Sequence, residues 1–208
     1  MADTAYTTLA KYASHTYEEK KSVFIGEASP ATSEEEALAF IASVKAKYPD
    51  ARHHVYAYLL RENSKNRYSD DHEPQGTAGM PVLDVLRKGG YTDAVIVVTR
   101  YFGGTLLGAG GLVRAYTAAA SGAVKEAGAR TYRTYRPAML SVSYTDYNKL
   151  LPELEKRGIR ILDTEYAEDV CLSLSMRDED YPPFERFVTE ATAARAILIP
   201  SDPVFDHD

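Results

Sequence analysis

The last third of the sequence carries the pattern that most constrains the fold, an alternation of strand-like and helix-like segments. The strand-like segments alternate apolar and polar residues, as in 170–174, whereas the helix-like ones space apolar residues by three or four. Six such segments are expected at 140–144, 147–154, 159–161, 170–176, 180–191 and 197–199. Their order β-α-β-β-α-β predicts a ferredoxin-like sandwich for residues 137–208. Pro152 lies inside the first of these helices, so we expect a kink or a late helix start there.

Residues 1–132 predict a separate α/β domain with longer connections. Strands are expected where β-prone residues cluster, and a capping box at Ser33 and Glu36 predicts the start of the first helix. The expected strands lie at 22–27, 54–60 and 94–99, and the expected helices at 33–48, 81–88 and 112–127. The polar segment 61–79 is expected to be a long loop. The overall class is α+β, with domains at 1–132 and 137–208.

An irregular linker is expected at 130–137, between the two domains. Its arginines, Arg130, Arg133 and Arg136, alternate with tyrosines at positions 132 and 135. Basic residues interleaved with aromatic ones can hold phosphates and stack bases. A solvated linker whose tyrosines pack on a domain is the favoured alternative.

Charge is distributed unevenly along the chain. Residues 1–136 carry 17 Lys and Arg against 15 Asp and Glu, and residues 137–208 carry 7 against 15, which gives net charges of +2 and −8. Nucleic acid contact therefore requires a local patch on the first domain. The lone Cys171 permits no internal disulfide, residues 1–12 lack a signal-peptide pattern, and no stretch approaches the roughly 20 apolar residues of a membrane helix. We expect a cytoplasmic protein without membrane contact.

Nine of the 13 glycines lie between Gly76 and Gly111, which predicts tight turns or close approach of a ligand to the backbone. The densest run leads from a buried strand into a helix, where exposed backbone N–H groups attract phosphate or carboxylate. We predict an anion-binding groove formed by Arg100, Gly103, Gly104, Gly110, Gly111 and Arg114. Glycines that serve only strand–helix packing are an equally weighted alternative. The P-loop and dinucleotide-binding motifs are absent, so no cofactor is predicted.

A second polar cluster, Asp70, Asp71, His72 and Glu73, precedes the glycine-rich run. With His53 or His54 it could bind a metal or supply an acid–base pair, but its spacing matches no ligand motif. A loop that fixes a turn or caps the next helix is favoured. We therefore predict no metal site and no catalytic residue. The residues expected to shape the loop beside the groove are Asp71, Glu73, Gly76, Thr77 and Gly79.

Two long motifs carry a family resemblance. The run 70–81, Asp-Asp-His-Glu-Pro-Gln-Gly-Thr-Ala-Gly-Met-Pro, resembles the first signature of the YigZ/Impact family, and 100–116 is similar to its second. The likeness covers residues 17 to 205. Two positions depart from the family pattern. His72 stands where a small residue is usual, and Val55 stands where a cysteine is common, which argues against a catalytic thiol there.

The resemblance implies a first domain similar to domain 2 of ribosomal protein S5 and a second similar to the C-terminal domain of elongation factor G. Because both relatives contact ribosomal RNA or the ribosome, it implies a non-catalytic RNA- or ribosome-associated factor that modulates translation, with RNA, the ribosome or a protein as partner. Two alternatives stay open. One is a small-molecule phosphotransferase or hydrolase that uses the glycine-rich turn for phosphate, with magnesium on residues 71–73. The other is a protein–protein interaction module.

Overall fold

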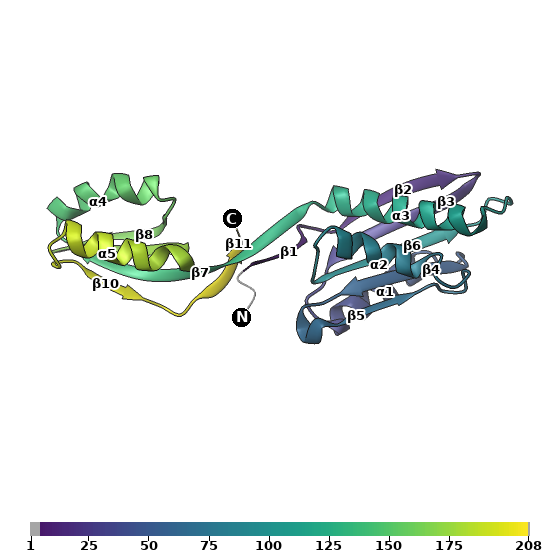
Figure 1. The fold of residues 1–208 in the computed structure, drawn as a ribbon, viewed down its shortest axis with the longest axis horizontal. Helices are drawn as coiled ribbons and strands as arrows, with labels where there is room; N and C mark the ends of the chain where they lie inside the picture. Colours follow the sequence, from purple (N-terminus) through teal and green to yellow (C-terminus); the bar gives the residue numbers. More distant parts are fainter. Residues whose placement is uncertain (1–4, 208) are drawn as a thin grey trace. The chain divides into compact units, whose positions relative to one another are not determined.

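The computed structural model describes residues 5–207 and divides into two compact units. The first unit spans Tyr6–Thr131, and the second contains the described residues from Tyr132 onward. Both combine helices with antiparallel strand pairs, which confirms the α+β class (Figure 1). Within residues 5–207, no helix combines the length and the apolar character needed to cross a membrane.

The first unit is built on an antiparallel sheet with the strand order β2-β3-β6-β4-β5. Its strands are β2 (Ala13–Glu19), β3 (Ser22–Pro30), β4 (His53–Leu59), β5 (Asn66–Ser69) and β6 (Ala94–Tyr101). Strand β6 is central and is buried over all but its last residue, as expected for a continuous apolar run. Helix α1 (Glu34–Lys47) packs on one face of the sheet, and α2 (Gly79–Lys88) and α3 (Gly108–Ala127) pack on the other (Figure 1).

Small residues let α3 approach the sheet closely. A Cβ atom placed on Gly26 of β3 would lie 2.4 Å from the carbonyl oxygen of Ala119, and one on Gly122 would lie 2.1 Å from the ring of His15. The buried face of α3 is rich in alanine, at positions 115, 119, 120, 123 and 127. The direct backbone contact fixes the position of α3 on β2 and β3, and thereby the position of its N-terminus.

Pairing between distant segments produces strands that the local pattern does not predict. The expected linker at 130–137 is wrong as an irregular segment, because it forms part of the long strand β7 (Ala129–Val142). Its first half pairs with β11 (Val204–His207), and β1 (Ala5–Leu9) also belongs to its sheet. The expected loop 61–79 contains the 3₁₀ turn η1 (Glu62–Ser64) and β5. These segments are rich in Tyr, Thr and Arg, and a partner strand supplies the hydrogen bonds that make them strands.

The second unit has the predicted β-α-β-β-α-β order. After β7 come α4 (Tyr144–Lys156), β8 (Arg160–Tyr166), β9 (Val170–Arg177), the 3₁₀ turn η2 (Asp178–Asp180), α5 (Tyr181–Ala191) and β10 (Ile197–Pro200). The strand order β10-β7-β9-β8, with both helices in one apolar core, is the ferredoxin-like arrangement (Figure 1). Helix α4 starts before the expected residue 147, because Ser143 caps it by accepting a 3.2 Å hydrogen bond from the Asp146 N–H. The helix continues through Pro152.

Gly26→Ala should destabilise the first unit by about 1–3 kcal/mol, because the added methyl group overlaps the α3 backbone. Gly110→Ala on exposed helix surface is the matched control, since its Cβ would lie 3.7 Å from its nearest neighbour. That control should be neutral or stabilising by up to about 1 kcal/mol. Urea unfolding of both variants measures the difference, and equal effects would contradict the close packing of α3.

Candidate functional site

The carboxylate of Asp70 organises the loop that precedes α2. One oxygen accepts hydrogen bonds from the Ala78 and Gly79 N–H groups at 3.1 and 2.7 Å, and the other accepts one from Gly76 at 2.9 Å. The loop hydroxyl of Thr77 donates to the Pro74 carbonyl at 2.6 Å. Asp70 therefore caps the N-terminus of α2, and the charge of that carboxylate is committed to the loop.

Asp71 joins the same loop to β4. Its side chain accepts a 2.6 Å hydrogen bond from the backbone N–H of His54, and its carbonyl lies 2.9 Å from Nδ1 of His53. His54 is buried, with Nε2 3.0 Å from the carbonyl of Tyr48. Asp71 and His72 both have left-handed backbone conformations, with φ of 42° and 70°. Two such non-glycine residues in succession show that the loop conformation is imposed by these contacts.

Glu73, Arg100 and Tyr116 form a buried network. The Arg100 guanidinium lies 2.5 Å from Oε1 of Glu73, and the Tyr116 hydroxyl donates to the same oxygen at 2.7 Å. The side chains of Arg100 and Glu73 are 7% and 4% exposed. Burial, followed by the negative charge of Glu73, raises the pKa of Tyr116 well above its usual range, so its hydroxyl stays protonated as a donor.

The network joins three elements that are distant in the sequence: the loop before α2, the end of β6, and α3. The sequence predicts that Arg100 contributes to an anion-binding groove. In the structure its guanidinium is buried against Glu73 and lies 5.3 Å from the centre of the Phe24 ring. Its position gives it a structural part in the site, since it holds the strand from which the glycine-rich turn departs.

The glycine-rich turn lies against the hairpin between β2 and β3. A Cβ atom on Gly103 would lie 2.0 Å from the backbone of Lys21, and the Gly103 N–H donates to the Ser22 hydroxyl at 3.1 Å. Lys20 and Lys21 form the hairpin turn with φ of 48° and 66°, where Asn-Gly is the usual pair. The contact brings two exposed lysines beside the turn, and the sequence pattern did not identify them.

Among the described residues, no side chain caps the N-terminus of α3: its N-cap residue is Leu107, and its first turn contains no acidic residue. Gly110 lies in that turn, and Nη1 of Arg114 is 3.7 Å from the place where a Gly110 Cβ would be. The guanidinium of Arg114 thus lies close to Gly110 in the first turn of the helix. Its charge also acts on Tyr17 of β2, where it opposes a rise in pKa caused chiefly by the hydrogen bond to Glu19.

The four predicted glycines differ in what the structure requires of them. Gly103 and Gly111 are needed for packing, since a Cβ would meet the Lys21 backbone at 2.0 Å or the Leu107 side chain at 2.9 Å. Gly104 has φ of 86°, which favours glycine. Gly110 has neither a left-handed φ nor a close neighbour. Among these four, Gly104 and Gly110 have open surroundings, and Gly110 is the one that lies in the first turn of α3.

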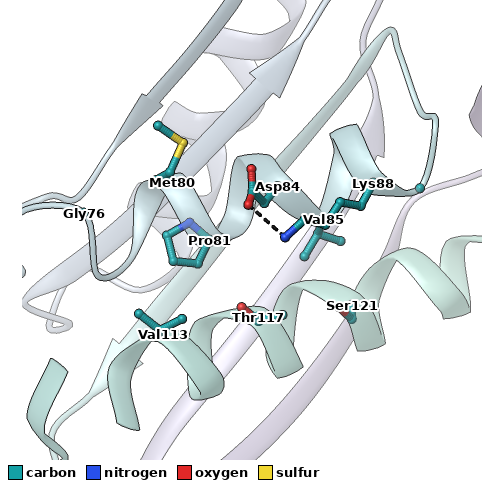
Figure 2. Close-up of a pocket in the computed structure, with 10 residues that line it drawn as sticks. Gly76, Met80, Pro81, Asp84, Val85, Lys88, Val113, Thr117 and Ser121 are labelled. Carbon is teal, nitrogen blue, oxygen red and sulfur yellow. Dashed lines mark ion pairs between the residues drawn. The ribbon is translucent and has the colours of Figure 1, made fainter. Parts of the chain in front are cut away.

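A groove of about 530 Å³ separates α2 from α3 (Figure 2). Met80, Pro81 and Val85 line it from α2, and Val113, Thr117 and Ser121 line it from α3. Figure 2 shows the two helices side by side, with Pro81 and Val113 near one end and Lys88 and Ser121 near the other. The ion pair between Lys88 and Asp84, at 3.0 Å, lies on the rim. The groove is mixed in character, with apolar side chains and two hydroxyl groups.

The acidic loop does not present a metal site in the described part of the chain. No group of three His, Cys, Asp or Glu side chains there is placed to hold a metal ion. Asp71 and Glu73 accept hydrogen bonds from His54, Arg100 and Tyr116 instead. The role of Asp71 and Glu73 in shaping the loop beside the groove stays a prediction.

Comparison with known protein families defines the class of both units. Residues 20–124 match the Impact N-terminal domain, and residues 140–195 match the Domain of unknown function (DUF1949). The protein is thus an Impact-type α/β domain followed by a ferredoxin-like domain of the kind that bears this second description.

Individual relatives give the same result. The chain is 35% identical over 193 residues to "IMPACT family member YvyE" of Bacillus subtilis, covering 92% of this chain and 89% of that protein. It is 35% identical over 160 residues to "IMPACT family member YigZ" of Escherichia coli, covering 76% and 78%. A solved structure described as a hypothetical protein matches with a TM-score of 0.60 at 29% identity, covering 95% and 98%. The chain belongs to the IMPACT family.

Arg100→Ala should destabilise the protein by about 3–5 kcal/mol, because it leaves the Glu73 carboxylate buried without its partner. Tyr116→Phe removes one hydrogen bond to that charge and should cost about 1.5–3 kcal/mol. Arg114→Ala on exposed surface is the control and should stay within about 0.5 kcal/mol. Urea unfolding tests the order, and a loss at Arg114 as large as that at Arg100 would refute the buried network.

Proposed function

We propose that this protein is a non-catalytic, translation-associated factor that binds RNA through the surface at the start of α3. The phosphate-binding surface comprises the exposed N–H groups at Gly108–Gly110, the guanidinium of Arg114, and the Lys20–Lys21 hairpin. The observation that carries the proposal is the uncapped N-terminus of a 20-residue helix with an arginine beside its open Gly110. Membership of the IMPACT family supports a translation-related regulatory role.

The electrostatics of this surface favour an anion. A helix N-terminus carries roughly half a positive charge, and an anion there is stabilised by about 0.3–1 kcal/mol at an exposed site. The start of α2 has the same dipole, but Asp70 already caps it. The first turn of α3 carries no acidic residue and is flanked by basic side chains, so its free donors are available to a phosphate group.

An extended nucleic acid suits this surface better than an enclosed small molecule. The turn from Phe102 to Gly110 is largely exposed, with Leu106 83% exposed and Phe102 51% exposed. An exposed aromatic ring beside cationic groups offers a base a stacking surface. The carboxylates of the neighbouring loop make structural hydrogen bonds, which disfavours a magnesium-dependent phosphotransferase.

The net charge of −8 over residues 137–208 gives the second unit a different part in this proposal. A polyanion is repelled by acidic surface within about 8–10 Å at physiological salt. The acidic unit therefore disfavours RNA at its own surface and directs binding to the first unit.

A second candidate function is a protein-interaction module, and the groove between α2 and α3 is the observation that favours it. Its apolar side chains beside Thr117 and Ser121 resemble a surface for a polypeptide with one or two apolar anchors. Thr117→Phe would fill the groove without adding charge. It should prevent binding of a protein partner, while RNA binding at Arg114 stays unchanged.

Arg114→Ala should weaken binding to a single-stranded RNA oligonucleotide. It should also reduce the slope of log affinity against log salt by about 0.7, the loss of one phosphate contact. Lys125→Ala on the last turn of the same helix removes an equal charge and is the matched control. Fluorescence anisotropy at several salt concentrations gives both slopes, and an unchanged slope for Arg114→Ala would rule out its phosphate contact.

Sedimentation of the protein with cell lysate tests the association with translation. We expect comigration with ribosomal subunits that weakens at high salt and that Arg114→Ala reduces. Binding that survives ribonuclease and is lost in Thr117→Phe would favour the protein-interaction function instead. Migration at the top of the gradient at every salt concentration would contradict both.

A further inference from the structure

Three arginines line one cavity in the second unit. The cavity has a volume of about 300 Å³ and lies where β7, β8 and β9 meet the end of α4 and the start of α5. Its lining residues are Tyr135, Arg157, Gly158, Arg160, Arg177 and Asp180. The phosphate-binding surface proposed above uses none of them.

This grouping is unexpected in an acidic domain. Residues 137–208 contain 7 Lys and Arg against 15 Asp and Glu, yet Arg157, Arg160 and Arg177 share one cavity. Asp180 is the acidic residue among those that line it. Like charges brought together repel, and an anion that enters the cavity relieves that repulsion. Positive charge is thus concentrated here against the overall charge of the unit.

Aromatic rings and polar partners fix two of the guanidinium groups in place. That of Arg160 lies 4.2 Å from the centre of the Tyr135 ring and donates to Asp206 at 2.8 Å. That of Arg157 lies 4.6 Å from the centre of the Phe187 ring. Rings held against guanidinium planes limit side-chain motion, so little conformational entropy is lost when the groups bind a ligand.

The partners of Arg157 and Arg160 leave hydrogen-bonding capacity unused. Glu153 is 3.6 Å from Arg157, beyond a good hydrogen bond, and Arg160 has two long contacts of 3.4 Å, to the His207 carbonyl and the Ser175 hydroxyl. Nε of Arg160 is buried without a partner in the described part of the chain. Glu153 and Asp206 do not line the cavity, so they compensate the arginines from outside it.

We propose that this cavity is a binding site for a small phosphate-bearing ligand. Planar guanidinium groups match the oxygens of a phosphate group in two-point hydrogen bonds, and several such groups around one cavity suit a dianion. The volume lies at the lower limit for small-molecule pockets. A smaller cavity of about 140 Å³ is lined by Arg133, Thr134, Arg177, Asp178 and Glu179, so two carboxylates offset its two guanidinium groups.

Titration of the full-length protein with inorganic phosphate and then with adenosine monophosphate tests the site. Binding is followed by ¹H–¹⁵N NMR in a phosphate-free buffer. We expect saturable shifts at Gly158 and the neighbouring backbone. Arg157→Gln should weaken binding about tenfold or more, since it removes a charge-assisted hydrogen bond. Arg186→Gln, an exposed position on α5, removes the same charge and should leave the affinity unchanged.

The same spectra report whether each variant is folded, and Arg157→Lys separates charge from shape. Retention of only part of the affinity by Arg157→Lys is expected, because lysine offers a point charge without the planar fork. Equal weakening by Arg157→Gln and Arg186→Gln would overturn the proposal, since the effect would then be one of net charge. Shifts confined to a titration with RNA, or no saturation by 10 mM phosphate (roughly a −3 kcal/mol limit), would overturn it as well.

Discussion

The buried ion pair between Arg100 and Glu73 is the interaction on which the candidate site depends. Two charges removed from water are tolerated only when each satisfies the other, and here the Tyr116 hydroxyl supplies a further donor to the same carboxylate. Together with Tyr116, the pair links the end of β6, the loop before α2 and the third turn of α3. Because the glycine-rich turn departs from one of these elements and ends at another, its two ends are held at a fixed separation. The position of the turn is therefore fixed even though the turn is rich in glycine.

Arg100 and Arg114 show how far sequence reasoning reaches within the site. Both flank the glycine-rich run, and the sequence gives no reason to distinguish them. The distinction arises from Glu73, which lies 27 positions before Arg100 and reaches it only in the folded chain. Arg100 is therefore part of the interior, whereas Arg114 lies on the exposed side of α3 beside Gly110. The Lys20–Lys21 hairpin is a similar case, because its backbone has the conformation of an Asn-Gly turn without the residues that usually indicate one.

The same limit explains which parts of the fold follow from local patterns. The ferredoxin-like unit is predictable because each of its strands and helices shows its own apolar period, from Val170 to Met176 for example. Strand β7 before Pro137 lacks such a period, and it becomes a strand because β11, about 70 positions later, pairs with it. The sequence around Gly26 does not indicate why glycine is needed there. The reason appears only in the folded chain, where the backbone of Ala119 excludes a side chain at this position. The local sequence pattern therefore predicts individual helices and strands. Contacts between distant residues decide which strands pair at the sheet edges, where backbones pack closely and where charges are buried.

The two proposed anion sites lie in different environments, and these environments would favour different ligands. The surface proposed for RNA is open, carries flanking lysines and exposes the ring of Phe102, which would suit successive phosphates of a chain. The arginine-lined cavity has a volume of about 300 Å³ and lies in a unit of net negative charge. Long-range repulsion from that unit acts on every charge of a polymer, but it is outweighed for a small ligand once three guanidinium groups are within contact distance. A polyanion would therefore bind the first unit, whereas a small phosphate ester could bind the arginine-lined cavity of the second.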